Sequence, residues 1–144
     1  MGVGDHNYLH MEFLSLPANA GVARVAVASF AAQLGFTWAE LEEVKVAVSE
    51  AVTNAVVHAY PGGRGPVKVR ARVDAGELAV EVEDRGVGIV DVTRAREASF
   101  TTDPDRMGLG FTFMESFMDK VEVWSEPGRG TRVSLIKRPG REQG

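Results

Sequence analysis

The chain has 144 residues, of which 44% are hydrophobic and 25% are charged, with a formal net charge of -4 and no cysteine. These numbers fit one ordinary globular domain, exclude disulfides and thiolate metal sites, and argue weakly against nucleic acid as a direct partner. No apolar run approaches the ~20 residues that a membrane span needs, and the N-terminus lacks a signal-peptide pattern, so we expect a cytoplasmic protein without a membrane partner.

The hydrophobic pattern predicts three helices and five strands. In chain order we expect a strand over 8–16, helices over 19–34 and 38–58, strands over 67–73 and 77–83, a helix over 111–120, and strands over 121–125 and 131–137. Thr37 and Glu40 form a capping-box pattern before the second helix, and Asn19 is a candidate cap for the first.

Short turns join the later strands into antiparallel hairpins. We therefore expect an α+β fold, a two-layer α/β sandwich in which helices cover one face of a mainly antiparallel sheet. It would form one domain over 1–137, followed by a flexible C-terminal tail over 138–144.

The second predicted helix carries a carboxylate and an amide in hydrophobic surroundings. Its expected sheet-facing stripe consists of Leu41, Val44, Val48, Val52 and Ala55. Glu50 and Asn54 lie roughly opposite this stripe, about 6 Å apart, on a side that is also largely apolar. A solvated helix face is one interpretation. A covered carboxylate needs a partner, so the pair is also a candidate site for a hard cation. His58, one turn further, either joins that site or is a polar helix end, and we favour the helix end.

Two glycine clusters lie after the predicted hairpin. The segment "DRGVG", Asp84 to Gly88, follows a strand, and its glycines let the backbone bend or a ligand approach. Asp84 either accepts a hydrogen bond from an exocyclic amine or belongs to an ordinary turn. The segment "GLGF", Gly108 to Phe111, opens a helix, where free backbone amides suit phosphate. The polar segment "TRAREASFTTDPDRM" between the clusters is either a lid over a ligand or a surface connection.

Together these segments resemble the ATP-binding fold shared by DNA gyrase, Hsp90, bacterial histidine kinases and MutL, known as the GHKL or Bergerat fold. "SEAVTNAVVHAY" is similar to the N box of that superfamily, "DRGVG" and "GLGF" to its two glycine boxes, and "GRGTRVSL" to its final strand motif. Within the superfamily the chain resembles, from end to end, the anti-sigma F factors of sporulating bacteria, which are serine protein kinases. The resemblance implies a lid loop over the nucleotide.

The resemblance implies a role for each matching position. Glu50 would be the general base that activates a serine hydroxyl, and Asn54 would bind the Mg²⁺ that bridges the ATP phosphates. Asp84 would accept a hydrogen bond from the adenine amine. The other positions expected to contact ATP or ADP are Gly86, Gly88, Thr101, Arg106, Gly108, Leu109, Gly110, Phe111 and Thr131. The segment before Gly108 is shorter than the usual form, which leaves the alignment of Arg106 open.

The resemblance also implies partners. The chain would bind and inhibit a sporulation sigma factor of the sigma F type, phosphorylate a serine of an anti-anti-sigma factor, and form a homodimer. Arg24, in the run "GVARVAVASF", is either a surface residue with a packed stem or a partner-binding anchor, and the resemblance favours the anchor. The alternatives are a nucleotide-dependent anti-sigma module without kinase activity and a related stress-response anti-sigma kinase.

Overall fold

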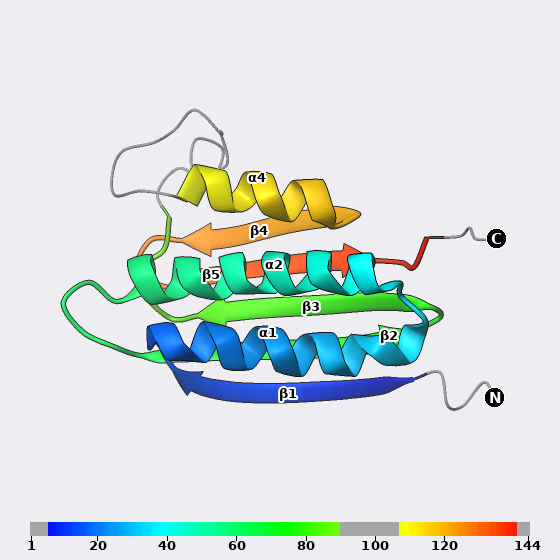
Figure 1. Ribbon diagram of the computed structural model, residues 1–144. Helices are drawn as coiled ribbons and strands as arrows, with labels where there is room; N and C mark the ends of the chain where they lie inside the picture. The colour runs from blue at the N-terminus through cyan, green and yellow to red at the C-terminus, as the bar shows by residue number, and fades with distance from the viewer. Residues whose placement is uncertain (1–5, 90–106, 141–144) are drawn as a thin grey trace.

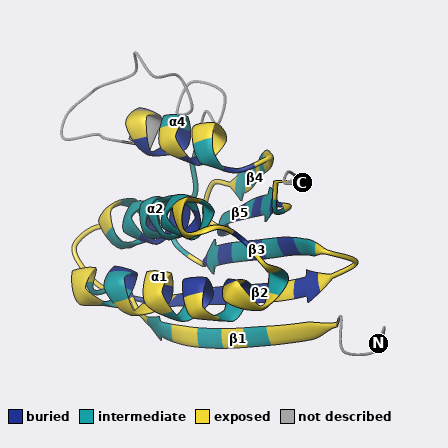
Figure 2. Ribbon diagram, turned by 45° about the vertical axis from the view of Figure 1, so that its right-hand side comes forward, coloured by how far each residue is buried: buried dark blue, intermediate teal, exposed yellow. Residues whose placement is uncertain are grey.

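The computed structural model describes residues 6–89 and 107–140, with the backbone alone for residues 107 and 108. Five strands form one antiparallel sheet in the order β1-β2-β3-β5-β4 (Figure 1). The strands are β1 Asn7–Leu14, β2 Pro66–Asp74, β3 Glu77–Asp84, β4 Lys120–Glu126 and β5 Gly130–Lys137. The helices are α1 Pro17–Ala31, α2 Trp38–Asn54 and α4 Met107–Phe117. All three helices lie on one face of the sheet, which confirms the expected two-layer α+β sandwich (Figure 2).

The starts of α1 and α2 follow different rules. For α2 the capping box is present: Thr37 Oγ1 accepts from the Glu40 N–H at 3.1 Å, and the Glu40 carboxylate accepts from the Thr37 N–H at 2.8 Å. The cap expected for α1 was wrong, because the helix begins at Pro17, whose fixed φ suits the first helical turn. Asn19 therefore lies inside the helix, and its Nδ2 donates to the Leu14 carbonyl at 2.9 Å.

The core lies between the sheet and the three helices, with α2 flanked by α1 and α4 (Figure 1). Val44, Val48 and Val52 are fully buried toward the sheet, as the stripe predicted. Ala47 and Ala51, on the sides of α2, are buried as well. Because neighbouring helices cover α2 on both sides, polar groups on those sides are partly withdrawn from water.

The outer face of the sheet is polar, as strand alternation predicted. Arg70 on β2 pairs with Glu81 at 3.3 Å and Glu83 at 3.0 Å on β3. The Arg132 guanidinium on β5 lies 5.3 Å from the centre of the Trp124 ring on β4. These are partly exposed cross-strand pairs, which stabilise the sheet modestly.

Two helix ends differ from a simple α-helix. After Asn54 the chain continues as a π-helical turn over Ala55–Ala59, so the helical segment extends about as far as expected. The third helix begins at Met107 rather than at residue 111, and the second glycine cluster therefore forms its first turn. The low helix propensity of glycine is outweighed there by packing, since Gly110 is buried against α2.

The C-terminal ends of α4 and β5 are joined through a buried lysine. Lys137 is 7% exposed, and its Nζ donates to the Phe117 carbonyl at 2.6 Å and to Glu43 Oε1 at 3.1 Å. Gly140 donates its N–H to Glu40 Oε2 at 2.7 Å, so the start of the expected tail contacts the domain. Residues 141–144 lie outside the described part of the chain. Among the described helices, none combines the length and apolar character needed to cross a membrane.

Candidate functional site

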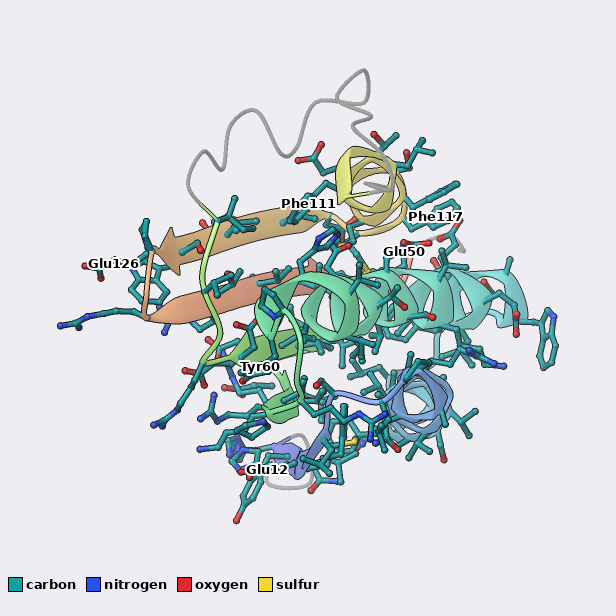
Figure 3. All side chains as sticks on the ribbon, turned by 90° about the vertical axis from the view of Figure 1, so that its left-hand side faces the viewer. Glu12, Glu50, Tyr60, Phe111, Phe117 and Glu126 are labelled. Carbon is teal, nitrogen blue, oxygen red and sulfur yellow. The ribbon has the colours of Figure 1, made fainter. Side chains whose placement is uncertain are left out.

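Glu50 and Asn54 meet the second glycine cluster where α2 contacts α4. Both side chains are half-buried, and Figure 3 shows Glu50 in the space between the two helices. A Cβ atom on Gly110 would lie 3.1 Å from Glu50 Oε1 and 3.5 Å from both polar atoms of the Asn54 amide. The glycine therefore lets the backbone of α4 approach a carboxylate and an amide directly. The structure brings these three predicted residues together.

The amide of Asn54 is incompletely satisfied. Its Nδ2 atom is buried and has no hydrogen-bond partner among the described residues. Buried polar groups in native proteins are nearly always paired, so an unpaired one here indicates a ligand or an ordered water. Because the two ends of an amide are interchangeable by a flip, either its oxygen or its nitrogen can face that ligand.

Asn54 and its neighbours fit a Mg²⁺ site if phosphate and water supply most of the ligands. Mg²⁺ keeps several waters and commonly takes only one or two oxygen ligands from protein, with phosphates supplying others. The described residues hold no group of three or more His, Asp or Glu side chains placed for a metal. A magnesium ion at the Asn54 oxygen would therefore depend on phosphate and water for its remaining ligands.

A cavity opens beside Asn54, between the end of α2 and strands β3 and β5. Its lining is mainly apolar with a few polar groups, as in small-molecule sites. The lining residues are Ala51, Asn54, Ala55, His58, Ala59, Val82, Asp84, Gly88, Ile89, Phe111, Thr131 and Val133. His58 lines this cavity, and the π-helical turn that carries it had no signal in the sequence.

Asp84 supplies a buried acceptor at the end of β3. It is only 8% exposed, and burial raises the pKa of its carboxyl group. The backbone N–H groups of Gly86, at 2.9 Å from Oδ1, and of Thr131 oppose that rise in pKa by stabilising the carboxylate. A carboxylate held in an apolar cavity in this way is suited to accept from an amine.

The first glycine cluster is held between a helix end and a hairpin. A Cβ on Gly86 would overlap the carbonyl oxygen of Ala59, and the next amide, Val87 N–H, donates to that oxygen at 2.8 Å. Gly88 has a φ of +79°, and a Cβ there would overlap the carbonyl oxygen of Glu126. Both glycines therefore permit close backbone contacts, and Gly88 lines the cavity itself.

Two hydroxyl groups behind the cavity were missed by sequence reasoning. Tyr60 accepts from the Arg85 N–H at 2.9 Å and donates to the Pro66 carbonyl at 2.7 Å, tying the end of the helix to the residue after Asp84. Ser125 on β4 contacts Thr131 Oγ1 at 2.8 Å. Tyr60 is the last residue of the segment "SEAVTNAVVHAY" around Asn54, which was a usable signal, whereas Ser125 had none.

The remaining predicted residues are divided between the site and other places. Phe111 is 1% exposed and lines the cavity, while Leu109 is 45% exposed on α4 and is absent from the lining. Gly108 belongs to the first turn of α4. Thr101 and Arg106, with the expected lid, lie outside the described residues.

Arg24 lies on the exposed side of α1 and does not line the cavity. Its guanidinium group folds back toward Gly21, with Nη1 3.8 Å from the Cβ position of that glycine. Val22 and Val25 beside it are 56% and 57% exposed. Arg24 is thus a charged residue beside exposed apolar side chains, and this surface is separate from the cavity.

Residues 13–137 match the family model of the histidine kinase-like ATPase domain. The chain is 46% identical over 134 residues to an anti-sigma F factor of Clostridium acetobutylicum, covering 92% of this chain and 94% of that protein. It is 50% identical over 136 residues to the anti-sigma F factor of Pasteuria penetrans, covering 92% and 91%. For the one from Caldanaerobacter subterraneus the identity is 45% over 140 residues, covering 96% and 98%.

Two solved structures share the fold at low sequence identity. One is the histidine kinase domain of the Erythrobacter litoralis EL346 blue-light activated histidine kinase, with a TM-score of 0.55 and 23% identity. The other is the Erythrobacter litoralis EL346 blue-light activated histidine kinase, with a TM-score of 0.60 and 21% identity. They match 85% and 86% of this chain, which spans 60% and 43% of theirs.

Proposed function

Since the chain belongs to the histidine kinase-like ATPase domain family, and within it to the anti-sigma F factors, we propose that it is an anti-sigma factor with serine protein kinase activity. It binds Mg-ATP, inhibits a sigma factor of the sigma F type and phosphorylates a serine of an anti-anti-sigma factor. These partners place it in the cytoplasm. The observation that carries the kinase proposal is that Glu50, Asn54 and Gly110 meet beside a mainly apolar cavity that is also lined by a few polar groups.

In the proposed reaction Glu50 acts as the general base. Its carboxylate accepts the proton of the acceptor serine, whose oxygen forms the new bond to the γ-phosphorus as the bond to ADP breaks. Mg²⁺, when bound, neutralises charge on the phosphates. Asn54 offers an oxygen toward that ion, and Gly110 lets the backbone of α4 lie directly against Glu50 and Asn54.

The cavity beyond Asn54 is proposed to hold the base of the nucleotide. Apolar side chains of Val82, Ile89 and Val133 line its walls and suit the faces of a planar ring. Asp84 accepts from an amine at the edge of that ring, and Thr131 lies beside it.

The partner surface is proposed to lie on α1 and the neighbouring edge strand. Arg24 stands among the exposed Val22 and Val25, and arginine among apolar residues is typical of interface anchors. β1 is an edge strand of the sheet, with an unpaired edge that suits contact with a second copy of the chain. We propose that the homodimer uses this helix and this edge.

The competing function is an anti-sigma module that holds nucleotide without transferring phosphate. Incubation with Mg-ATP and an anti-anti-sigma protein, followed by mass spectrometry for phosphoserine, separates the two. We expect transfer by the unchanged protein, a loss of at least about a hundredfold in Glu50→Gln, and no change in Glu42→Gln, a surface residue of the same helix. Equal transfer by Glu50→Gln would refute its role as base, and no transfer by the unchanged protein would favour the binding module.

A further inference from the structure

The hydroxyl group of Ser125 lies at the centre of three contacts behind the cavity. It is directly opposite Thr131 in the pairing of β4 with β5. Its Oγ is 2.6 Å from the Ile89 backbone nitrogen, 3.0 Å from the Gly130 carbonyl oxygen and 2.8 Å from Thr131 Oγ1. Two segments, one ending at Ile89 and the other at the start of β5, are therefore joined by one hydroxyl group, and each contributes a residue to the cavity wall.

Counting protons fixes the direction of each contact. A serine hydroxyl has one proton to donate and two lone pairs that accept. A carbonyl oxygen only accepts, so the proton of Ser125 goes to Gly130, and a backbone N–H only donates, so Ile89 occupies one lone pair. The second lone pair then accepts the proton of Thr131. With its proton used in this way, the Thr131 oxygen has only lone pairs left for the cavity.

The neighbour of Thr131 in the cavity is also an acceptor. Thr131 is the direct cross-strand partner of Asp84 in the pairing of β3 with β5, and both residues line the cavity. Side chains of such pairs lie about 4.5–5.5 Å apart at Cβ, close enough to share one ligand group. An ionised carboxylate and a hydroxyl without a free proton present acceptors side by side, which together suit an NH₂ group with two protons.

We propose that Ser125 is a positioning residue that holds the Thr131 hydroxyl as an acceptor toward the base, and so selects a 6-amino purine over a 6-oxo purine. The inference rests on the proposed function in that the ligand is a nucleotide. A 6-amino group donates to both acceptors. A 6-oxo group places a third acceptor against them, and a buried acceptor without a donor is costly.

Removing the Ser125 hydroxyl has two consequences. Thr131 loses its acceptor and is free to turn its proton toward the cavity, where it can donate to a 6-oxo group. The Ile89 N–H loses its partner as well, so the end of the first glycine cluster is less firmly held. The first effect changes the preference between bases, whereas the second weakens binding of both.

The test is equilibrium binding of Mg-ATP and Mg-GTP to the full chain by titration calorimetry. In Ser125→Ala we expect the ATP affinity to fall roughly tenfold, in line with one lost hydrogen bond, and the preference for ATP over GTP to shrink by a similar factor. Ser125→Thr keeps a hydroxyl group and should restore the preference. Ser134→Ala, a serine on the outer face of β5, is the matched control and should match the unchanged protein.

A second pair of proteins, both carrying Thr131→Val, separates the proposed role of Ser125 from a general loss of folding. In Thr131→Val there is no hydroxyl to orient, so adding Ser125→Ala should leave the ratio of ATP to GTP affinity unchanged. A Ser125→Ala protein that keeps the full preference for ATP would overturn the inference and leave the proposed function standing. If the unchanged protein bound neither nucleotide, the proposed function itself would fail.

Discussion

Gly110 faces Glu50 across the α2–α4 contact. A Cβ atom added at Gly110 would lie 3.1 Å from Glu50 Oε1. That separation is tighter than ordinary van der Waals contact, so a methyl group must displace the carboxylate or shift α4. The two residues are 60 positions apart in the chain (110 − 50), yet each limits what the other position can hold.

Gly110→Ala should therefore separate stability from activity. Alanine in a helix is favoured over glycine by about 1 kcal/mol, which offsets part of the steric cost, so we expect a folded protein. The displaced carboxylate should lower phosphoserine formation by at least about tenfold, since a misplaced base loses its catalytic geometry. Gly63→Ala, where a Cβ meets nothing within 4 Å, is the control. Unchanged transfer by Gly110→Ala would contradict the assigned geometry.

Asn54→Ala should weaken nucleotide binding only when magnesium is present. The amide Nδ2 has no partner among the described residues, so its removal should cost the free protein little stability. Mg-ATP affinity should fall about tenfold or more, while ATP binding in EDTA stays nearly constant. Both are measured by calorimetry.

Asn19→Ala is the matched control, and we expect it to lower stability without weakening nucleotide binding. Its amide donates to the Leu14 carbonyl far from the cavity, so its loss should lower the free energy of unfolding by about 1 kcal/mol and spare Mg-ATP binding. If Asn54→Ala bound Mg-ATP like the unchanged protein, the proposed metal ligand would be wrong.

Asp84→Asn should stabilise the free protein while it weakens ATP binding. Burial raises the pKa of Asp84 above its ordinary value of 3.8, so the unfolded chain ionises at lower pH than the folded one. The contribution of Asp84 to stability is therefore fully present below pH 3.8 and is lost as the pH rises through the folded pKa. Asparagine removes this loss and can keep the contact with the Gly86 N–H.

Thermal unfolding of both proteins from pH 3 to 8 checks this prediction. The midpoint of Asp84→Asn should exceed that of the unchanged protein at pH 7, and the difference should narrow in acid. A variant that is less stable at pH 7 would show that the carboxylate is stabilised by the fold rather than strained by it.

Local patterns in the sequence were enough for most of the architecture. Strand alternation in β2 and β3, the Thr37–Glu40 capping box and the apolar stripe of α2 each depend on neighbouring residues, and each was confirmed. The placement of Glu50 and Asn54 on one side of a covered helix followed from helical periodicity. Their chemical roles came only from the resemblance of the surrounding motifs.

The details that were missed depend on contacts between distant segments. The early start of α4 follows from burial of Gly110 against α2, and helix propensity alone predicts the opposite. The link between Ser125 and Ile89 joins residues 36 apart, and no local pattern encodes it. The π-helical turn that brings His58 to the cavity likewise contacts strands distant in sequence, β3 and β5.

Lys137 and Glu50 contact opposite ends of α4. Its ammonium group holds the Phe117 carbonyl at one end of the helix, while Gly110 near the other end touches Glu50 and Asn54. A helix of 11 residues is about 16 Å long, so a tilt of a few degrees about the Lys137 end moves the first turn by about 1 Å. α4 is thus held at its last turn by a buried lysine and at its first turn by the contact with α2, so even a small tilt of the helix changes the position of the glycine turn beside the proposed phosphate site.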